Sequence, residues 1–340
     1  ADVPRSWGDY HPGNFNGSFS GPVSAAEALQ RSLNLPFIDL LERYGPRKFN
    51  TRLRNAGLQL SIPGHNPNLS IILGGAGASL EELVTVYMAL GREGGTTKLK
   101  YRRDELEGSD VERYFLSPAS AWITRQVLSE IKRPGSLNTL ASMRKKATLA
   151  WKTGTSFGFR DSWAIGVSKD YTIGVWVGRP DGTAQPGHSG RETAAPLLFT
   201  VADYLNFNVA TVDEESYRKP ISVEKKTICW PLGTLKTKSL ELCHREYQAW
   251  ILDGVIPPTW HSTDSDAWQS NPITVQVSLK TSKRVMAGCM DDQSTEAKQI
   301  ALWPKILEPW IPYYLRRNGQ IPTMDEGCDK GYSATSSLHI

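Results

Sequence analysis

The sequence lacks the features of membrane-spanning segments, nucleic-acid-binding surfaces and metal sites. No run of 18 or more apolar residues occurs, which is about the length that a helix needs to cross a bilayer. Basic and acidic residues nearly balance, at 39 and 35, and no block of like charges is present, so nothing indicates nucleic-acid binding. The 6 histidines are scattered without a His-x-x-x-His pair, so we expect no metal site.

Cysteine is scarce and confined to the last third of the chain, at Cys229, Cys243, Cys289 and Cys328. No Cys-x-x-Cys pair is present, and the spacing fits no common zinc site. Such cysteines in a tryptophan-rich segment are typical of two disulfides in an oxidising compartment, while reduced, buried thiols are the alternative. Three pairings are possible, and we favour Cys229–Cys243 with Cys289–Cys328 because the first pair closes a short local loop.

The most informative stretch is the run Lys-Thr-Gly-Thr at 152–155. The segments 147–155, 162–167 and 171–177 are rich in β-branched and aromatic residues and bounded by Gly, Asp and Ser, so each is predicted to be a strand. The tight turn at 168–170 joins the last two as an antiparallel hairpin. We therefore expect the run on, or at the end of, the first of three sequential antiparallel strands.

A strand with this composition suits the binding of an extended peptide. An accessible strand edge can pair with the backbone of a ligand, and Gly154 lets that backbone come close. Lys152 and the hydroxyls of Thr153 and Thr155 can hold a carboxylate. The tripeptide Lys-Thr-Gly also arises by chance in roughly one chain in ten of this length, so an ordinary surface strand is the alternative.

Helix signals precede this strand. The capping-box signature Ser24–Glu27 begins a short helix that runs into Ser32-Leu33-Asn34, and Pro36 suits the first turn of a second helix, which ends at Tyr44. Further helices are expected near 46–57, 79–92, 118–132 and 192–205. Ser32 and Asn34 therefore lie at a helix–helix junction, where a hydroxyl and an amide can project into a cleft instead of bonding within a helix.

The composition changes after Pro220. Residues 221–340 contain all the cysteines and about half of the 11 tryptophans, and they show no long periodic helix. Residues 274–279 alternate as a strand. We expect an α+β fold over residues 1–220, with helices on the faces of an antiparallel sheet, followed by a small, mostly β and loop module over 221–340.

Together these motifs resemble the transpeptidase domain of class A penicillin-binding proteins. The resemblance is carried by the Ser-x-Asn run at 32–34, by the Lys-Thr-Gly run at 152–154, and by Asp161–Trp163 after it. The tail from Ile228 to Gly233 is similar to the region that follows that domain in the 1C type. The resemblance implies the fold shared by penicillin-binding proteins and serine β-lactamases for residues 1–220.

The resemblance also implies a reaction and its ligands. In this family a Ser-x-x-Lys serine attacks the D-Ala–D-Ala bond of a peptidoglycan stem peptide, and an amine of a neighbouring stem resolves the acyl-enzyme into a cross-link. β-Lactams acylate the same serine. The implied location is the periplasm, in a protein that is anchored in the inner membrane and also carries a glycosyltransferase domain. No cofactor, metal or nucleic acid is implied, and the C-terminal module is a candidate docking site for envelope proteins.

Residue roles carry over by position from the family. Ser32 would relay a proton toward the leaving group, and Asn34 would hydrogen-bond the substrate amide. Lys152 would supply positive potential across the cleft. Thr153 and Thr155 would bind the terminal carboxylate, and the backbone N–H of Thr155 would form half of the oxyanion hole.

One part of the family pattern is missing, because no Ser-x-x-Lys precedes Ser32. Four such pairs occur later, in the wrong order, and are interpreted as chance matches: Ser129–Lys132, Ser142–Lys145, Ser216–Lys219 and Ser222–Lys225. A second Ser-x-Asn at 136–138 lacks the helical context of the first. The sequence starts at Ala1 without a methionine, so we expect a piece of a longer chain whose nucleophile lies upstream and which is inactive alone.

Two other interpretations are left open. The first is a non-catalytic module that binds the cell wall or an envelope partner and keeps the fold as a scaffold. The second is a serine β-lactamase. The long cysteine-rich tail and the lack of an identifiable deacylating glutamate count against the β-lactamase.

Overall fold

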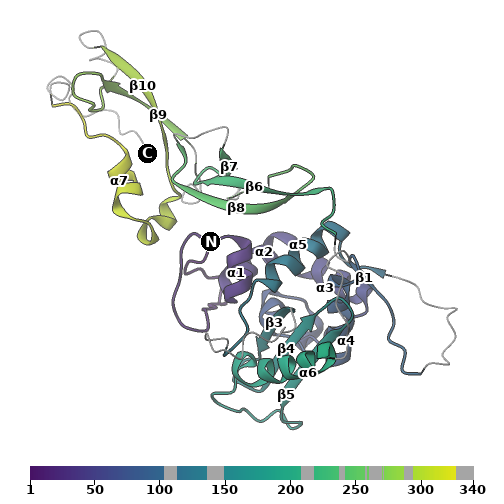
Figure 1. The fold of residues 1–340 in the computed structure, drawn as a ribbon. Helices are drawn as coiled ribbons and strands as arrows, with labels where there is room; N and C mark the ends of the chain where they lie inside the picture. Colours follow the sequence, from purple (N-terminus) through teal and green to yellow (C-terminus); the bar gives the residue numbers. More distant parts are fainter. Residues whose placement is uncertain are drawn as a thin grey trace. The chain divides into compact units, whose positions relative to one another are not determined.

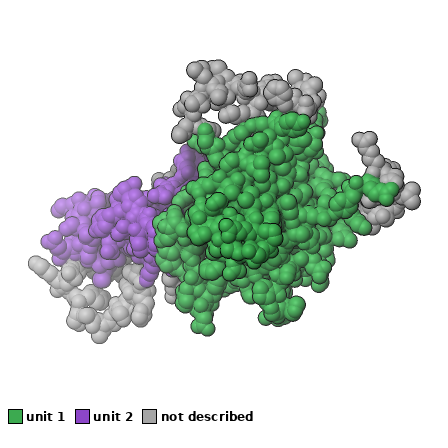
Figure 2. All heavy atoms as spheres, turned by 90° about the horizontal axis from the view of Figure 1, so that it is seen from below, with its two compact units in different colours: residues 1–19, 23–223 green, residues 20–22, 224–340 purple. Residues whose placement is uncertain are grey.

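A computed structural model describes residues 1–102, 113–135, 149–207, 218–236, 242–256, 259, 270, 272–286 and 294–326 (Figure 1). The chain forms two compact units (Figure 2). Unit 1 comprises Ala1–Phe19 and Val23–Val223, and unit 2 comprises Ser20–Pro22 and Glu224–Ile340. Within the described residues, no helix has both the length and the apolar character needed to cross a membrane.

The centre of unit 1 is a three-stranded antiparallel sheet. Its strands β3 (Ala150–Thr155), β4 (Asp161–Val167) and β5 (Thr172–Gly178) lie in the order β3-β4-β5. The sequence prediction of three sequential antiparallel strands, with Lys-Thr-Gly-Thr at the end of the first, is confirmed. Among the described strands β3 has only one neighbour, β4, so no described strand pairs with its other edge.

Helices cover both faces of this sheet (Figure 1). Trp151 of β3 is buried against Phe199 of α6 (Ala195–Phe207), with ring centroids 5.1 Å apart. Its neighbour Ala150 packs with Leu128 of α5 (Pro118–Ser129) and Leu29 of α1. Because side chains alternate across a strand, Lys152 lies on the same face as Ala150, toward α1 and α5.

The helices before the sheet follow the expected signals, with one difference. Helix α1 (Ala25–Arg31) begins where Ser24 Oγ accepts the N–H of Glu27 at 3.0 Å. Helix α2 (Asn34–Tyr44) has Pro36 in its first turn and ends at Tyr44, as expected, although it already begins at Asn34, before the proline. A proline fits there, since the N–H groups of a first turn have no partner within the helix.

The other elements of unit 1 surround this core. Their bounds are α3 Pro46–Ala56, η1 Pro63–His65, η2 Leu69–Leu73, α4 Leu80–Tyr87, η3 Met88–Leu90, β1 Gly95–Thr96, β2 Arg113–Tyr114 and η6 Gly190–Ala194. The capping box at Ser79 and Glu82 is present at the start of α4. The helix expected over 192–205 is divided, because a π-helical turn, η6, begins at Gly190 and α6 follows it from Ala195.

Unit 2 consists of short sheets and loops, as its composition predicts. Strands β6 (Val223–Trp230), β7 (Thr234–Leu235) and β8 (Arg245–Leu252) form one sheet in the order β7-β6-β8. Strands β9 (Pro272–Ser278) and β10 (Thr295–Ala301) form an antiparallel pair. The shorter elements η12 (Lys305–Trp310), η13 (Tyr313–Leu315) and α7 (Arg317–Gln320) follow.

A disulfide joins Cys229 to Cys243, so the first expected pairing is confirmed. Cys289 and Cys328 lie outside the described residues. Next to the disulfide, Trp230 packs edge-on against Trp303, whose indole N–H donates to His244 Nδ1 at 2.9 Å. The bridge and the two indole rings therefore share one core.

We expect the paired substitution of Cys229 and Cys243 by serine to lower the unfolding free energy of unit 2 by about 3 kcal/mol. The cysteines are 14 residues apart, and the open loop gains conformational freedom mainly in the unfolded chain. Hydrogen exchange should accelerate in β6 and leave β4 of unit 1 unchanged. Equal acceleration in both units would show that the bridge does not act locally.

Candidate functional site

The junction between α1 and α2 holds Ser32 in a restricted conformation. Ser32 is in the left-handed region, with φ 57° and ψ 42°, and closes α1 through its N–H. For a residue other than glycine this conformation carries strain and is found mainly where packing enforces it. The enforcing residue is Leu33, which is buried with Val23 and Ala28. With Leu33 directed inward, Ser32 and Asn34 on either side of it remain accessible.

The amide of Asn34 is fixed by a separate segment of the chain. Its side-chain Nδ2 donates to the carbonyl oxygen of Gly13 at 2.7 Å. Its backbone N–H donates to Oδ1 of Asn14 at 2.8 Å. Asn34 is therefore held at both its backbone and its side chain as the first residue of α2.

Lys152 joins the sheet to this junction. Its Nζ donates hydrogen bonds to Ser32 Oγ and, at 3.0 Å, to the carbonyl oxygen of Thr153. Burial, and to a smaller degree the positive charge of Arg191, lowers the pKa of Lys152 from its ordinary 10.5 to about 8. An ammonium with this pKa gives up its proton far more easily than a surface lysine does, so the pair can pass a proton.

The backbone of β3 presents alternate residues to its free edge. Ser156 N–H donates to the carbonyl oxygen of Asp161, so the backbone groups of Ser156 face β4. Because successive residues of a strand direct their backbone groups to opposite sides, those of Thr153 and Thr155 face the open edge. An extended ligand along this edge meets those two residues.

The hydroxyl of Thr155 is oriented by the start of η6. Thr155 Oγ1 accepts the backbone N–H of Gly190 at 3.0 Å. Gly190 also lies tightly against the strands, because a Cβ built on it would be 2.3 Å from the carbonyl oxygen of Gly154. At Gly154 itself, a Cβ would make only ordinary contact with Trp163 at 3.5 Å, so packing does not by itself require glycine there.

Residues 185–191 form the segment before α6 that lines the end of β3, and no motif in the sequence pointed to them. It is attached by a hydrogen bond from Gln185 N–H to the carbonyl oxygen of Phe159, 2.8 Å, and by one from Ser162 Oγ to the carbonyl oxygen of His188, 3.1 Å. It brings Arg191 near Lys152. The available signal was Ser189 followed by Glu192, a helix-start pattern in which Ser189 does cap η6.

The remaining serine candidates lie elsewhere or are not described. Ser129 is at the end of α5, where its hydroxyl donates to the carbonyl oxygen of Gln126 at 2.8 Å. Ser222 lies in the turn before β6. Outside the described residues are Ser136, Asn138, Ser142 and Ser216.

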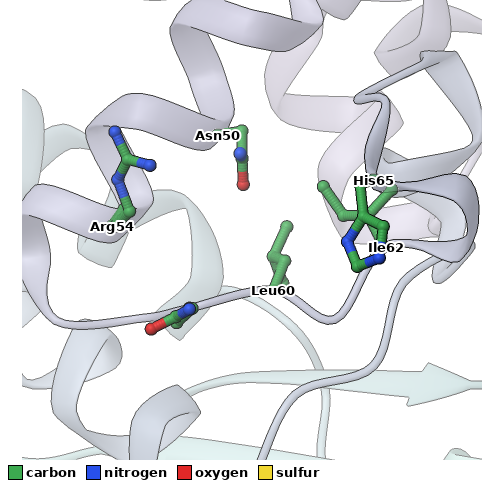
Figure 3. A pocket seen from close by; sticks show the side chains of 6 residues that line it. Asn50, Arg54, Leu60, Ile62 and His65 are labelled. Atoms are coloured by element: carbon green, nitrogen blue, oxygen red, sulfur yellow. The ribbon is translucent and has the colours of Figure 1, made fainter.

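Among the described residues, those of the two motifs belong neither to a metal-binding cluster nor to the lining of the hollow in unit 1. The described residues contain no group of three or more His, Cys, Asp or Glu side chains that could hold a metal ion. A hollow of about 160 Å³ in unit 1 is lined by Asn50, Arg54, Gln59, Leu60, Ile62 and His65 (Figure 3). None of the residues of the two motifs lines this hollow.

Comparison with protein families gives two matches in unit 2. Residues 222–251 match a family described as the penicillin-binding protein 1C linker domain. Residues 266–319 match one described as the penicillin-binding protein 1C second linker domain. The tryptophan-rich sheets of unit 2 therefore have the sequence pattern of linker domains.

Comparison with curated proteins extends the similarity to the whole chain. The chain is 43% identical to penicillin-binding protein 1C of Escherichia coli K12 over 342 residues, which covers 100% of this chain and 43% of that protein. It is 28% identical to penicillin-binding protein 1B of Vibrio cholerae over 232 residues, 65% of this chain and 27% of that protein. The chain thus spans less than half the length of these relatives.

Solved structures share the fold. Penicillin-binding protein 1A from Haemophilus influenzae has a TM-score of 0.58 at 14% identity, over 76% of this chain and 44% of that one. The penicillin-binding protein PonA1 from Mycobacterium tuberculosis has a TM-score of 0.51 at 18% identity, over 63% of this chain and 64% of that one. The α+β fold class expected from the sequence is confirmed.

We expect the Lys152 ammonium to titrate with a midpoint near pH 8, measured by NMR of its labelled Cε. Replacement of Arg191 by alanine should raise the midpoint, because it removes a repelling charge. The folded-state pKa lies below the unfolded one, so the unfolded state binds more protons between pH 8 and 10.5. The contribution of Lys152 to stability should therefore rise with pH across that window. An ordinary midpoint near 10.5 would show that the side chain is hydrated.

We expect Gly190→Ala to disturb the end of β3. The added methyl group meets backbone oxygens of Gly154 and Trp163 that cannot rotate away, so η6 must move and the bond to Thr155 is lost. Hydrogen exchange of the amide at position 190 should accelerate about tenfold, on the order of the loss of one hydrogen bond. The control is Gly77→Ala, where a Cβ makes only ordinary contact with Ser61 at 3.5 Å. Equal effects of the two variants would refute the steric argument.

Proposed function

Because the chain belongs to the class A penicillin-binding proteins of the 1C type, we propose that unit 1 carries part of the D,D-transpeptidase site of a peptidoglycan synthase. The observation that carries this proposal is the hydrogen bond from Lys152 to Ser32, which joins residues 120 positions apart beside the free edge of β3. Peptide cross-linking needs a proton carrier at such an edge, and this pair supplies one.

The proton relay follows from the direction of this bond. Lys152 donates to Ser32 Oγ, so the hydroxyl proton of Ser32 is free to pass to the amine that leaves the cleaved D-Ala–D-Ala bond. Ser32 then regains a proton from the Lys152 ammonium. The lowered pKa of Lys152 supports this transfer, because its proton is held less firmly than that of a hydrated lysine.

The stem peptide is proposed to lie extended along β3. The N–H of Thr155 faces the open edge and is placed to stabilise the oxyanion that forms at the attacked carbonyl. The hydroxyls of Thr153 and Thr155 hold the terminal carboxylate, with Gly154 between them leaving room for the peptide backbone. Asn34, fixed across the cleft, bonds the substrate amide.

The attacking serine of the family pattern has no counterpart before Ser32 in this chain. We propose that acylation requires a Ser-x-x-Lys segment in addition to the residues present, and that the gene product with such a segment works in the periplasm. β-Lactams, which mimic the D-Ala–D-Ala end, would then be bound by Lys152, Thr153 and Thr155 and would acylate that added serine.

Intact mass spectrometry after incubation with a fluorescent penicillin tests this proposal. We expect no adduct on the present chain, and an adduct on a longer gene product that contains a Ser-x-x-Lys segment. In that longer form Lys152→Ala should slow acylation by about 100-fold or more, the usual contribution of acid–base catalysis.

Peptide mapping separates the proposal from its rivals. An adduct on Ser129, Ser142, Ser216 or Ser222 of the present chain would refute the assignment of the nucleophile. Acylation that is unchanged by Lys152→Ala would favour a scaffold in which the motif has no chemical role. Rapid turnover of the penicillin, seen as release of the hydrolysed product, would instead indicate a β-lactamase.

A further inference from the structure

We propose that Asn14 is a positioning residue of this site. Asp2 anchors Asn14, and Asn14 holds Asn34, and through it Ser32, in place for the transpeptidase reaction. This inference rests on the proposed function for the reaction that it serves, and on hydrogen bonds of the described residues for the geometry. Asn14 belongs to neither of the two sequence motifs.

The side-chain amide of Asn14 is buried, with 8% of its surface exposed, and its bonds leave it one orientation. Nδ2 donates to Asp2 Oδ1 and to the carbonyl oxygen of Ser18, both at 2.8 Å. Oδ1 accepts the backbone N–H of Asn34 at 2.8 Å. Two acceptors face the NH₂ group and a donor faces the oxygen, so a flipped amide would lose all three bonds.

The hydrogen bond from the Asn34 N–H to Asn14 Oδ1 replaces the usual N-cap bond of α2. The first N–H groups of a helix have no partner within it, and they are usually bonded by a Ser, Thr, Asp or Asn at the N-cap. The N-cap of α2 is Leu33, whose side chain offers no oxygen. Asn14 supplies the acceptor from a distant segment, which leaves Leu33 free to be buried.

The anchor of Asn14 is itself fixed on α2. Asp2 is fully buried, and the N-terminal segment that carries it is attached by Arg5, which forms ion pairs with Asp39 and Glu42 of α2. The segment therefore follows α2 as a unit, with Asn14 at the first residue of the helix. A buried carboxylate without its partner is costly, so Asp2 strongly favours the observed orientation of Asn14.

The same loop also reaches the Lys-Thr-Gly-Thr strand. Phe15, next to Asn14, packs edge-on against Phe159 with ring centroids 5.9 Å apart. Phe159 lies in the turn that connects β3 to β4, just after Thr155. The loop of Gly13, Asn14 and Phe15 thus contacts the Ser-x-Asn motif and the turn that follows the Lys-Thr-Gly-Thr strand.

A set of variants separates positioning from general stability. Asn14→Ala removes all three side-chain bonds. Asn14→Asp keeps an acceptor for Asn34 but places a second carboxylate against Asp2. Adding Asp2→Asn to it restores one donor–acceptor pair with the roles exchanged, but not the bond to the carbonyl oxygen of Ser18. The matched control is Thr96→Val, which removes a buried hydroxyl bonded to the carbonyl oxygen of Ala56 at 2.9 Å, away from the site.

The first measurement is the acylation rate of the longer gene product with a fluorescent penicillin, beside its thermal melting temperature. We expect Asn14→Ala to slow acylation about 10-fold to 100-fold, which is the effect of a displacement of roughly 1 Å. Thr96→Val should change the acylation rate less than about twofold, at a similar loss of melting temperature. Asn14→Asp should also be slow, and the double exchange should recover part of the rate, because it restores the pair with residue 2 but not the bond to Ser18. Equal rates in the Asn14→Ala and Thr96→Val variants would overturn the proposal.

The second measurement uses the present chain and needs no acylation. Ser32→Ala should change the Lys152 titration midpoint in the wild-type background, because it removes the partner of the ammonium. In the Asn14→Ala background the same substitution should have little effect, since Ser32 is already displaced. A Ser32→Ala effect that persists in full would overturn the positioning role even if acylation is never observed. The longer gene product of wild-type sequence could also fail to be acylated while the effect of Ser32→Ala on the Lys152 midpoint still depends on Asn14. That result would refute only the proposed function.

Discussion

The hydrogen bond from Lys152 to Ser32 is the interaction on which the arrangement of this site depends. A lysine ammonium removed from water is costly unless nearby oxygens replace its hydration. Here Ser32 and the carbonyl oxygen of Thr153 replace part of the water around the ammonium. The remaining free-energy cost of burial lowers the pKa of Lys152 to about 8. The lowered pKa of Lys152 therefore follows from where the fold places it.

That placement is produced by packing on both faces of β3. Trp151 is fixed against α6, and the alternation of the strand then directs Lys152 to the opposite face, where α1 ends. At that end, burial of Leu33 holds Ser32 in its left-handed conformation. Two buried apolar side chains, each next to a motif residue, thus align polar groups that lie far apart in the sequence.

Unit 2 is stabilised differently. Its sheets are small, and a core of Trp230, Trp303 and the bridge between Cys229 and Cys243 compensates for the limited apolar area. The matches of this region to linker domains agree with a compact module that contains none of the motif residues.

The sequence by itself determined the local features. Neighbouring residues have short-range conformational preferences, and these predict the local features. The features are the strands between 150 and 178, the caps at Ser24 and Ser79, the Cys229–Cys243 bridge and the two motifs. Only the tertiary structure decided that Ser32 meets Lys152, that Gly190 orients Thr155, and that Asn14 caps α2. Those contacts join residues that are 120, 35 and 20 positions apart, so no local pattern encodes them. They are fixed by the packing of the buried core, which brings these segments together.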